Sequence, residues 1–592
     1  MKRKYMADFE TAVWNSDETY VWAYAFCEIG NESNIKIGNN IEEFMEFCEK
    51  SNNSDFYFHN LKFDGEFIIS YLLENGFKFI TDKKYKEDKT FTSLISDTGV
   101  FYSITVYFKI GNKKDIKVNF FDSLKIIPFP VEDIPKYFGL PDSKLKIDYK
   151  QERERGHELT KEEKDYVSED VIIVSKALNQ IFQEGLTKMT RAGNALDDYK
   201  KIIGKDSFKH YYPSLDENVD KDIRRAYRGG FTYLNPIYKN KVNGETITLD
   251  VNSLYPWAMY SCPLPWGEPY YFEGKYEEDE IYPLYVQQIT CSFELKKNKI
   301  PMIQIKNNRF LFNGTEYLRS SNNEIVSLIL TNVDLKLFFE QYEVYDLHYI
   351  NGYKFKSIKG RLFKEYIDKW TERKIEAGKS GNKGQRQLAK LMLNSLYGKF
   401  ATSIKVKEKI PFIDNGVVRY LMGEEKTKSG LYLPVACFVT AWAREKTIRT
   451  SQAITDYSLA KYGVDKYIYS DTDSIKTTLS IEELKQFCDI DDYKLGYWAH
   501  EQTAIKSKFI RAKTYICKVP AKDKDGNDII ETEITCAGMP KSCYDQVTFD
   551  NFKEGLTVGG KLMFKHVKGG VILVDTEFTI KNDEDIKMIK HF

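Results

Sequence analysis

Two predicted strands in this 592-residue chain end in acidic residues, and this feature limits the possible folds most. Residues 466–475 alternate apolar and polar side chains and then present Asp471 and Asp473. Whether the strand continues or turns back as a tight hairpin, these carboxylates lie close together, and no Lys or Arg separates them. A second strand, 245–251, carries Asp250 near its end. A divalent cation relieves the repulsion between such carboxylates, so we expect a sheet that brings these strand ends together.

Each of these two motifs alone is equally consistent with an acid in a turn. Together they favour two-metal phosphoryl transfer, in which oxygen ligands hold two cations about 3.5–4 Å apart. One cation activates the attacking oxygen and the other stabilises the leaving pyrophosphate. The three acids therefore predict a metal-dependent transferase site.

The first third of the chain carries a second group of acids. Asp8 and Glu10 are two positions apart in a predicted strand, and Asp64 follows further on. Tyr166 and Asp170 are four positions apart, on one face of a predicted helix. Any one of these acids alone is better explained as a surface or helix-capping residue. Their combination predicts a second metal site.

A predicted helix near residue 390 presents a cation, an amide and an aromatic ring on one face. Lys390, Asn394 and Tyr397 fall at positions i, i+4 and i+7. Such a face suits a nucleotide, because the ammonium group binds phosphates and the ring stacks near a base. The alternative is an ordinary amphipathic helix whose Lys stem covers apolar surface.

Charge is balanced over the whole chain but not locally. The 87 Lys and Arg equal the 87 Asp and Glu, so net charge gives no general attraction to nucleic acid or membrane. Residues 353–400, however, contain thirteen basic and four acidic residues, a net charge of +9. The helical pattern from about 354 to 400 indicates two antiparallel helices joined by an exposed loop at 378–384. Taken alone, this segment is better explained as a solvated helical hairpin.

Composition argues against several protein classes. Nine scattered Cys without a C-x-x-C pair indicate reduced intracellular thiols, and seven His without metal-ligand spacing argue against zinc chemistry. The longest mostly apolar run, 433–443, is far shorter than the roughly 20 residues of a membrane span, so we expect a soluble, cytosolic protein. A P-loop is not supported, because Arg373 stands where the first Gly of that motif would precede Gly378-Lys379-Ser380.

The length implies about four domains or subdomains. In the first third, strands alternate with helices, which predicts a mixed sheet flanked by helices. The expected strands are 19–28, 55–58 and 117–121, and the expected helices are 42–50, 64–75 and 160–182.

In this order the motifs resemble family B DNA polymerases, specifically the protein-primed replicases of small tailed bacteriophages with linear genomes. The resemblance rests on three exonuclease motifs, three polymerase motifs, an element that links the two activities, and a lysine motif at the primer terminus. These motifs are Asp8–Glu10, His59–Asp64, Tyr166–Asp170, Asp250–Pro256, Lys390–Gly398, Tyr469–Ser474, Tyr227–Gly230 and Lys513–Tyr515.

The resemblance implies an α+β multidomain fold, with an RNase H-like 3′–5′ exonuclease domain followed by a right-hand polymerase domain. It also implies two insertions, one for docking a terminal (priming) protein and one for strand displacement and processivity. A β-rich stretch at 285–312 and a predicted hairpin at 405–422, with its turn at 414–416, leave room for both. The expected ranges are 1–190 exonuclease, 191–261 first palm part, 262–358 first insertion, 359–401 fingers, 402–433 second insertion, 434–543 second palm part and 544–592 thumb.

At the polymerase site, the resemblance implies Asp250 and Asp473 as the main metal ligands, with help from the Val251 carbonyl and Asp471 as a neighbouring catalytic carboxylate. Tyr255 would pack under the sugar and exclude a ribose 2′-OH. The implied nucleotide-binding residues are Tyr255, Lys374, Lys390, Asn394 and Tyr397. Two departures stand out: Ser470 replaces a frequent Cys, and the fingers loop looks longer, which affects the match of Lys374.

At the exonuclease site, the resemblance implies metal binding by four acids, with Tyr166 and Lys144 orienting the attacking water or the scissile phosphate. The four acids are Asp8, Glu10, Asp64 and Asp170. The implied DNA-binding residues are Thr11, His59, Asn60, Phe63, Ser123 and Leu124 for the frayed strand, and Tyr227, Gly229, Gly230, Lys513 and Tyr515 near the primer.

We therefore expect a DNA-directed DNA polymerase with a 3′–5′ proofreading exonuclease that replicates a linear viral genome by protein priming, with strand displacement. The implied cofactor is Mg²⁺, two ions per active site, for which Mn²⁺ substitutes. The implied partners are template and primer DNA, dNTPs, a terminal protein and a viral single-strand-binding protein, for a monomer in the cytoplasm of the bacterial host. Two alternatives stay open: a nuclease with a degenerate polymerase half, and a scaffold that stacks single strands on its 86 aromatic side chains.

Overall fold

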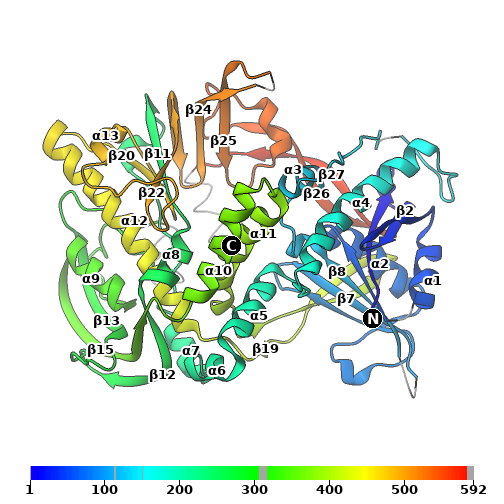
Figure 1. Ribbon diagram of the computed structural model, residues 1–592, viewed down its shortest axis with the longest axis horizontal. Helices are drawn as coiled ribbons and strands as arrows, with labels where there is room; N and C mark the ends of the chain where they lie inside the picture. The colour runs from blue at the N-terminus through cyan, green and yellow to red at the C-terminus, as the bar shows by residue number, and fades with distance from the viewer. Residues whose placement is uncertain are drawn as a thin grey trace.

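The computed structural model describes residues 2–51, 53–111, 115–149, 151–305, 316–523 and 525–582. An N-terminal α/β domain lies at one side, and a larger assembly of sheets and helices lies at the other (Figure 1). Between them stand two antiparallel helices, α10 (Lys364–Lys379) and α11 (Lys383–Phe400). In the described parts of the chain, no helix is both long and apolar enough to cross a membrane.

The N-terminal domain is built on an eight-stranded mixed sheet of order β3-β2-β1-β4-β8-β7-β6-β5. β1 pairs antiparallel with β2 and parallel with β4, so the predicted mixed sheet is confirmed. The strands are β1 Lys4–Thr11, β2 Val21–Glu28, β3 Asn31–Gly38, β4 Ser54–Phe58, β5 Lys78–Phe79, β6 Thr90–Ile95, β7 Phe101–Lys109 and β8 Ile116–Asp122. The helices are α1 Ile41–Ser51, α2 Leu61–Glu74, α3 Ile134–Phe138 and α4 Lys161–Gln183.

Three helices follow, α5 (Arg191–Ile203), α6 (Lys205–Tyr211) and α7 (Glu217–Arg224). α5 packs against α11, and Trp370 Nε1 of α10 donates to Asp198 Oδ2 of α5 at 2.8 Å. The expected first palm part begins at 191, but α5 lies against the helical pair and not in the palm sheet.

The palm sheet has the order β22-β11-β21-β20-β9. The 30-residue helix α12 (Leu433–Tyr462) contacts β20 and β21 of this sheet as well as α8 (Leu254–Ser261). The other elements are β9 Thr232–Leu234, β11 Thr246–Val251, β20 Tyr467–Asp471, β21 Ser474–Thr477, α13 Ile481–Leu484 and β22 Trp498–Ala504.

Both expected insertions form β structure. The first has its own sheet, of order β12-β15-β13-β14, with helix α9 (Asn332–Gln341); residues 306–312 of the predicted β-rich stretch lie outside the described residues. The second contains the predicted hairpin, whose turn residues Asn415 and Gly416 have φ of 50° and 79°, as a tight hairpin turn requires. The strands are β12 Pro263–Glu273, β13 Leu284–Leu295, β14 Val326–Thr331, β15 Tyr342–Lys359, β16 Lys405–Val406, β17 Lys409–Asp414, β18 Val417–Met422 and β19 Lys426–Thr427.

The C-terminal part holds a four-stranded sheet, β10-β23-β24-β25, and the hairpin β26–β27. Ile510 and Ile516 share one apolar core with Phe549 and Phe578, so the packing crosses the boundary expected at residue 544. The strands are β10 Val242–Asn243, β23 Lys506–Arg511, β24 Thr514–Lys522, β25 Asp528–Cys536, β26 Thr557–Val567 and β27 Gly570–Thr579.

The helical prediction for residues from about 354 to 400 is corrected at two places. Residues 353–359 belong to strand β15, and the first helix begins only at Lys364. The predicted loop 378–384 shrinks to Ser380–Asn382, because the two helices extend to Lys379 and from Lys383. Gly381, with φ of 70°, permits this tight turn.

Candidate active sites

The palm sheet brings together the three predicted acids of the polymerase motifs. β20 ends at Asp471, Thr472 and Asp473 form the turn, and β21 begins at Ser474, so the tight-hairpin alternative is correct. The Val251 amide donates to the Asp473 carbonyl oxygen at 2.7 Å. This bond ties the hairpin turn to the end of β11, where Asp250 lies.

The carboxylates of Asp250 and Asp473 repel each other in a partly dehydrated site. Burial and then the charge of Asp473 raise the pKa of Asp250 to about 7. Burial also raises the pKa of Asp473, with contributions from Asp471 and Glu501. Oxygen ligands that repel one another in this way fit a divalent cation.

In the described residues, no three His, Cys, Asp or Glu side chains form a ready-made metal cage at either site. This is compatible with Mg²⁺, which keeps several waters and binds through one or two carboxylates together with substrate phosphates. Asp250 and Asp473 would supply that carboxylate pair.

Asp471 differs from the other two acids because it already has partners. Its two carboxylate oxygens accept from Lys513 Nζ at 2.7 and 2.9 Å, and Tyr469 OH donates to one of them at 3.1 Å. The Lys513 amide in turn donates to Tyr469 OH at 2.9 Å, and the Tyr515 ring lies 5.4 Å from that of Tyr469. The structure thus places the lysine motif beside the catalytic hairpin.

The 227–230 element supports the turn of this hairpin. A Cβ on Gly230 would lie 2.5 Å from Thr472 Oγ1, so only glycine fits there. Thr447 Oγ1 of α12 donates to the Thr472 carbonyl at 2.7 Å. From the same helix, Arg444 donates to the carbonyls of Arg228 at 2.7 Å and Gly229 at 2.8 Å. These bonds fix the element against the palm, with Tyr227 partly buried in the main core.

The predicted nucleotide-binding rings meet. The Tyr255 and Tyr397 rings stack with centroids 4.0 Å apart and planes 27° apart. Tyr255 lies in the first turn of α8, which begins three residues after the end of β11, so it follows Asp250 by five positions in the chain. Burial raises the pKa of both phenols, so the two rings are neutral.

The short turn between α10 and α11 brings Lys374 close to Lys390. Burial, and then the charges of Lys390 and Arg386, lower the pKa of Lys374. Arg386, Lys390 and Asn394 are exposed at i, i+4 and i+8 along α11. Three cations therefore share one face, which suits a triphosphate. Arg386 was not predicted, although its spacing of four residues from Lys390 was a usable signal.

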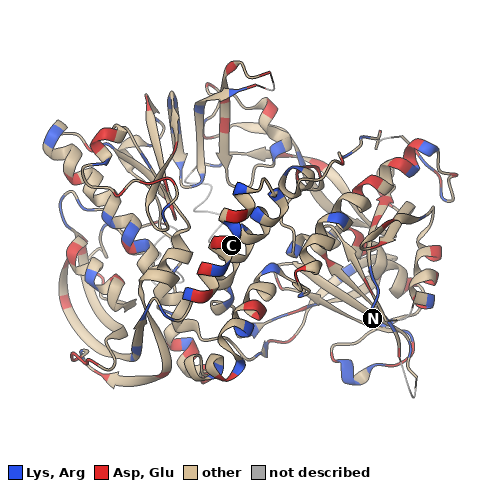
Figure 2. Cartoon of the chain, viewed as in Figure 1, with Lys and Arg blue, Asp and Glu red and all other residues tan. Residues whose placement is uncertain are grey.

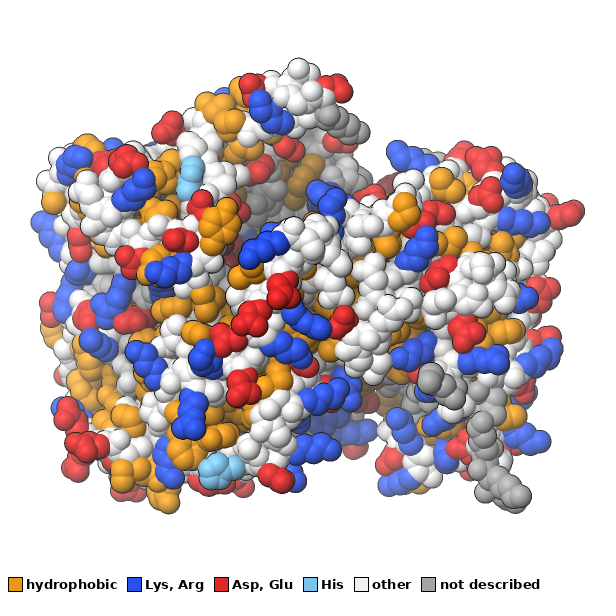
Figure 3. Space-filling model, in the orientation of Figure 1, with side chains coloured by type: hydrophobic (Ala, Val, Ile, Leu, Met, Phe, Trp, Pro, Cys, Tyr) orange, Lys and Arg blue, Asp and Glu red, His pale blue; other side chains and the backbone are white. Residues whose placement is uncertain are grey.

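All four acids of segment 353–400 lie on the opposite side of α10. Glu365, Asp368, Glu372 and Glu376 are spaced by three or four residues and therefore form one helical face. Figures 2 and 3 show this acidic face turned toward the viewer along α10. The acids of α10 thus share one outer face, where Lys364 pairs with Asp368, while Lys374 lies on the opposite side of the helix.

Two more charged residues near Asp250 were not predicted. The register between β11 and β22 shifts at Thr248 and Leu249, and Glu501 is the extra residue in this bulge. Bulges redirect side chains beside active sites, and Glu501 raises the pKa of both palm acids, after larger effects. Lys476 is 4% exposed and donates to Thr248 Oγ1 at 2.8 Å. Sequence alternation marks both as strand residues but cannot show a bulge.

The second group of acids gathers between β1, α2 and α4. Asp8 and Glu10 are on the same face of β1 as Met6, which packs in the core beside α4. Burial and then Asp170 raise the pKa of Asp8 to about 8. Burial and then Asp8 raise the pKa values of Glu10 and Asp64 well above normal.

Two oxygens of this acid cluster are buried without a hydrogen-bond partner, namely Asp64 Oδ1 and Asp170 Oδ1. Buried orphan oxygens in a group of mutually repelling acids fit a cation site. Lys144 Nζ lies 2.8 Å from Asp170 Oδ2, and the hydroxyls of Tyr149 and Tyr166 hydrogen-bond. The structure therefore brings together all six residues predicted for this site.

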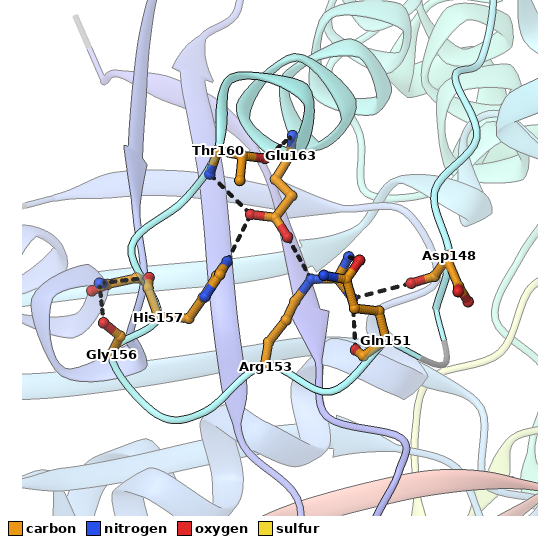
Figure 4. A network of polar contacts seen from close by, with 8 residues as sticks. Asp148, Gln151, Arg153, Gly156, His157, Thr160 and Glu163 are labelled. Carbon is orange, nitrogen blue, oxygen red and sulfur yellow. Dashed lines mark hydrogen bonds and ion pairs between the residues drawn. The ribbon is translucent and has the colours of Figure 1, made fainter.

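A buried ion network positions the segment that precedes α4 (Figure 4). Arg153 Nε donates to Glu163 Oε1 at 2.6 Å, and the Thr160 amide donates to Glu163 Oε2 at 3.0 Å. Against the effect of burial, Arg153 and then the Thr160 amide lower the pKa of Glu163 to about 2. This capped start fixes α4, which carries Tyr166 and Asp170.

Two residues expected to grip the frayed strand are already engaged within the protein. His59 uses one ring nitrogen with Ser123 Oγ, at 2.9 Å, and the other with the Phe129 carbonyl, at 2.7 Å. Ser123 has no exposed surface, and Thr11 is only 8% exposed. Contact with the single strand stays a prediction for these three residues, and for Asn60, Phe63 and Leu124, which are partly exposed.

Comparisons with known proteins agree with this arrangement. The model of the family DNA polymerase type B, organellar and viral, matches residues 46–489. The DNA polymerase of Bacillus phage B103 is 46% identical over 98% of this chain and 100% of its own, and that of Streptococcus phage Cp-1 is 32% identical over 98% and 99%. The structure of phi29 DNA polymerase complexed with primer-template DNA matches with a TM-score of 0.91 and 44% identity, over 98% of this chain and 100% of that one.

Fold, sites and relatives define a DNA-directed DNA polymerase with an exonuclease domain followed by palm, fingers and thumb. The chain belongs to the type B DNA polymerases, and within them to the phi29-type phage enzymes. The fold class and family expected from the sequence are confirmed.

Proposed function

We propose that this polymerase replicates a linear phage genome from a protein primer, proofreads in the 3′–5′ direction and displaces the strand ahead of it. The bond between the Val251 amide and the Asp473 carbonyl carries the polymerase part, since it joins the two acids at one point. The titles of two similar structures describe phi29 DNA polymerase with primer-template DNA and with incoming nucleotides. The hydrogen bond between the two acid-bearing segments and these similar structures lead us to assign template, primer and dNTPs as substrates.

In the polymerase site, Asp250 and Asp473 would hold two Mg²⁺ ions, or Mn²⁺ in their place, with help from the Val251 carbonyl. When bound, these ions supply charge stabilisation for the phosphates and an activated 3′ oxygen. Lys374, Lys390 and Arg386 bind the triphosphate as cations. Tyr255 packs under the sugar, where its ring excludes a 2′-OH, and the stacked Tyr397 ring holds it there.

In the exonuclease site, Asp8, Glu10, Asp64 and Asp170 would hold the ions that activate water for phosphodiester hydrolysis. Lys144 and Tyr166 orient the water or the scissile phosphate, and Phe63 stacks on a base of the single strand. Near the primer terminus, Lys513, Tyr515 and the 227–230 element contact DNA.

Two substitutions test the division of labour. Asp473→Ala should abolish dNTP incorporation and leave excision of a single-stranded oligonucleotide intact, and Asp8→Ala should do the reverse. Asp492→Ala, which removes an exposed carboxylate near the palm, is the matched control and should change neither activity. Normal incorporation by the Asp473→Ala enzyme would refute the site assignment.

We assign the first insertion, 262–358, to docking of the terminal protein and the second, 402–433, to opening the duplex. The enzyme would act as a monomer in the cytoplasm of the bacterial host, with a viral single-strand-binding protein on the displaced strand. Incubation with a candidate terminal protein, Mg²⁺ and labelled dNTP should give a covalent protein–nucleotide adduct. If the enzyme extends DNA primers but never forms this adduct, protein priming is refuted and the proposed polymerase activity is not.

A further inference from the structure

One buried carboxylate outside both catalytic sites joins three distant parts of the chain. Glu66 lies on α2, two residues after Asp64, and is 3% exposed. Its Oε2 accepts from Tyr420 OH of β18 at 2.7 Å, and its Oε1 lies 3.1 Å from His566 Nε2 of β26. Tyr420 and His566 stand 354 and 500 positions from Glu66 in the chain. We call Glu66, Tyr420 and His566 the clasp.

Apolar contacts place both hairpins on the same helix. Val418 of β18 and Val571 of β27 are 1% and 0% exposed, and both belong to the core that α2 shares with the N-terminal sheet. A Cβ on Gly570 would lie 2.6 Å from the Phe67 ring of α2. The clasp is therefore the polar centre of a packed three-part junction.

The two hairpins also contact each other beside the clasp. Val417 forms a β-bridge with Lys568, and a Cβ on Gly416 would lie 3.1 Å from the Lys568 side chain. Lys568 is held to the N-terminal domain in turn, because the Thr19 amide donates to its carbonyl at 2.9 Å. α2, β17–β18 and β26–β27 thus form a closed circuit of contacts.

The circuit has a mechanical consequence for β17–β18. An isolated two-stranded hairpin is only marginally stable, so it needs an external anchor to press against a base-paired duplex. The Tyr420 side chain points toward Glu66. The next residue, Leu421, points to the other side of the strand and is 59% exposed. The hairpin therefore has a buried anchor on one face and an exposed apolar side chain on the other, where a wedge would act.

We propose that Glu66 is a positioning residue for strand displacement, which holds β17–β18 rigidly on the exonuclease domain and acts through Tyr420. This inference rests on the proposed function of the second insertion. Loss of the carboxylate leaves the Tyr420 hydroxyl and the His566 ring without their shared buried partner. Polymerisation on an open template should not require the anchor, because the clasp residues bond to neither the β20–β21 hairpin nor α10 and α11 within the described part of the chain.

The test compares extension of one primer on a single-stranded template and on the same template with a downstream strand annealed. Glu66→Ala and Tyr420→Phe should slow extension through the duplex at least about tenfold relative to the open template. Glu66→Gln should retain most displacement, because its amide oxygen still accepts from Tyr420. The double variant Glu66→Ala/Tyr420→Phe should be no worse than Glu66→Ala, since the hydrogen bond that Tyr420→Phe removes is already lost in Glu66→Ala.

Glu74→Ala, an exposed carboxylate on the same helix, is the matched control and should displace like the parent. A variant that excises a single-stranded oligonucleotide at a rate within about twofold of the parent has an intact α2. If Glu66→Ala fails to fold, Tyr420→Phe still tests the inference, because it removes only the hydroxyl oxygen. If the parent enzyme displaces the downstream strand and the variants displace it equally well, only this inference is overturned. If the parent enzyme stops at the duplex, the proposed strand displacement is overturned as well.

Discussion

The pKa of Asp250 leads to a measurable pH dependence of Mg²⁺ binding. Because this pKa is raised to about 7 by burial and by Asp473, the carboxyl group is mostly protonated at pH 6 and mostly charged at pH 8. A metal ligand must be charged, so binding at pH 6 first requires loss of a proton. From pH 8 to pH 6 the charged fraction of Asp250 falls from about nine-tenths to about one-tenth. This weakens the apparent Mg²⁺ affinity about tenfold, or by about 1.4 kcal/mol. The raised pKa of Asp473 acts in the same direction.

The assay is a calorimetric titration of Mg²⁺ into the Asp8→Ala enzyme with primer-template DNA, so that the exonuclease acids contribute less. Repeating it in two buffers with different ionisation heats measures the protons released by Asp250, which should be about one near pH 6 and about one half near pH 7. In Asp473→Asn the neighbouring charge is absent, so the pH dependence should shift to lower pH. Equal affinity at pH 6 and pH 8 would refute the electrostatic reasoning.

The same groups make the metal-free enzyme less stable as the pH rises. A carboxyl whose pKa is raised from 3.8 to about 8, as for Asp8, keeps its proton in the folded chain after the unfolded chain has lost it. The folded state then binds more protons, so stability falls as the pH rises between about 4 and 8. Mg²⁺ should restore the stability most strongly near pH 8. A thermal midpoint that does not change when Mg²⁺ is added at pH 8 would contradict this prediction.

Four further outcomes are expected. Tyr255→Val should incorporate rNTPs better than the parent in single-nucleotide assays, and equal discrimination would exclude a steric role. Lys374→Ala should raise KM for dNTPs about tenfold, as loss of one charge-assisted phosphate contact implies, whereas Lys379→Ala at the exposed end of α10 should not. Asp334→Ala leaves the buried Arg444 unpaired and should cost about 3–5 kcal/mol, seen as a lower thermal midpoint and slower incorporation. DNA affinity should fall steeply with salt, with a linear log–log slope.

Local sequence patterns predicted much of the fold because the interactions behind them are local. Alternation located β11 and β20, and the turn residues Asn415 and Gly416 located the hairpin β17–β18. The spacing of Tyr166 and Asp170 placed both on one face of α4. The choice between strand and hairpin at Asp473 needed the structure, because both arrangements satisfy the same alternation.

Residues that act through distant partners were beyond the sequence. Nothing near Glu66 indicates that its carboxylate meets a tyrosine and a histidine hundreds of positions away. Glu501 depends on a bulge, which changes no residue type. The sequence also could not show that both ring nitrogens of His59 bond within the protein, to Ser123 and to the Phe129 carbonyl.

Zero net charge is consistent with a DNA-binding enzyme here because the charges are sorted in space. Burial, and then the charge of a neighbouring acid, raise the pKa of Asp8 and of Asp250, so bound cations would offset several of these acids. On α10 the acids occupy one outer face, while Lys374 points with Lys390 and Arg386 toward the opposite, basic face. Electrostatic attraction acts over roughly a Debye length of 8–10 Å, so DNA responds to the face it meets and not to the sum over the chain. A balanced total charge is therefore compatible with a local basic face formed by Lys374, Arg386 and Lys390.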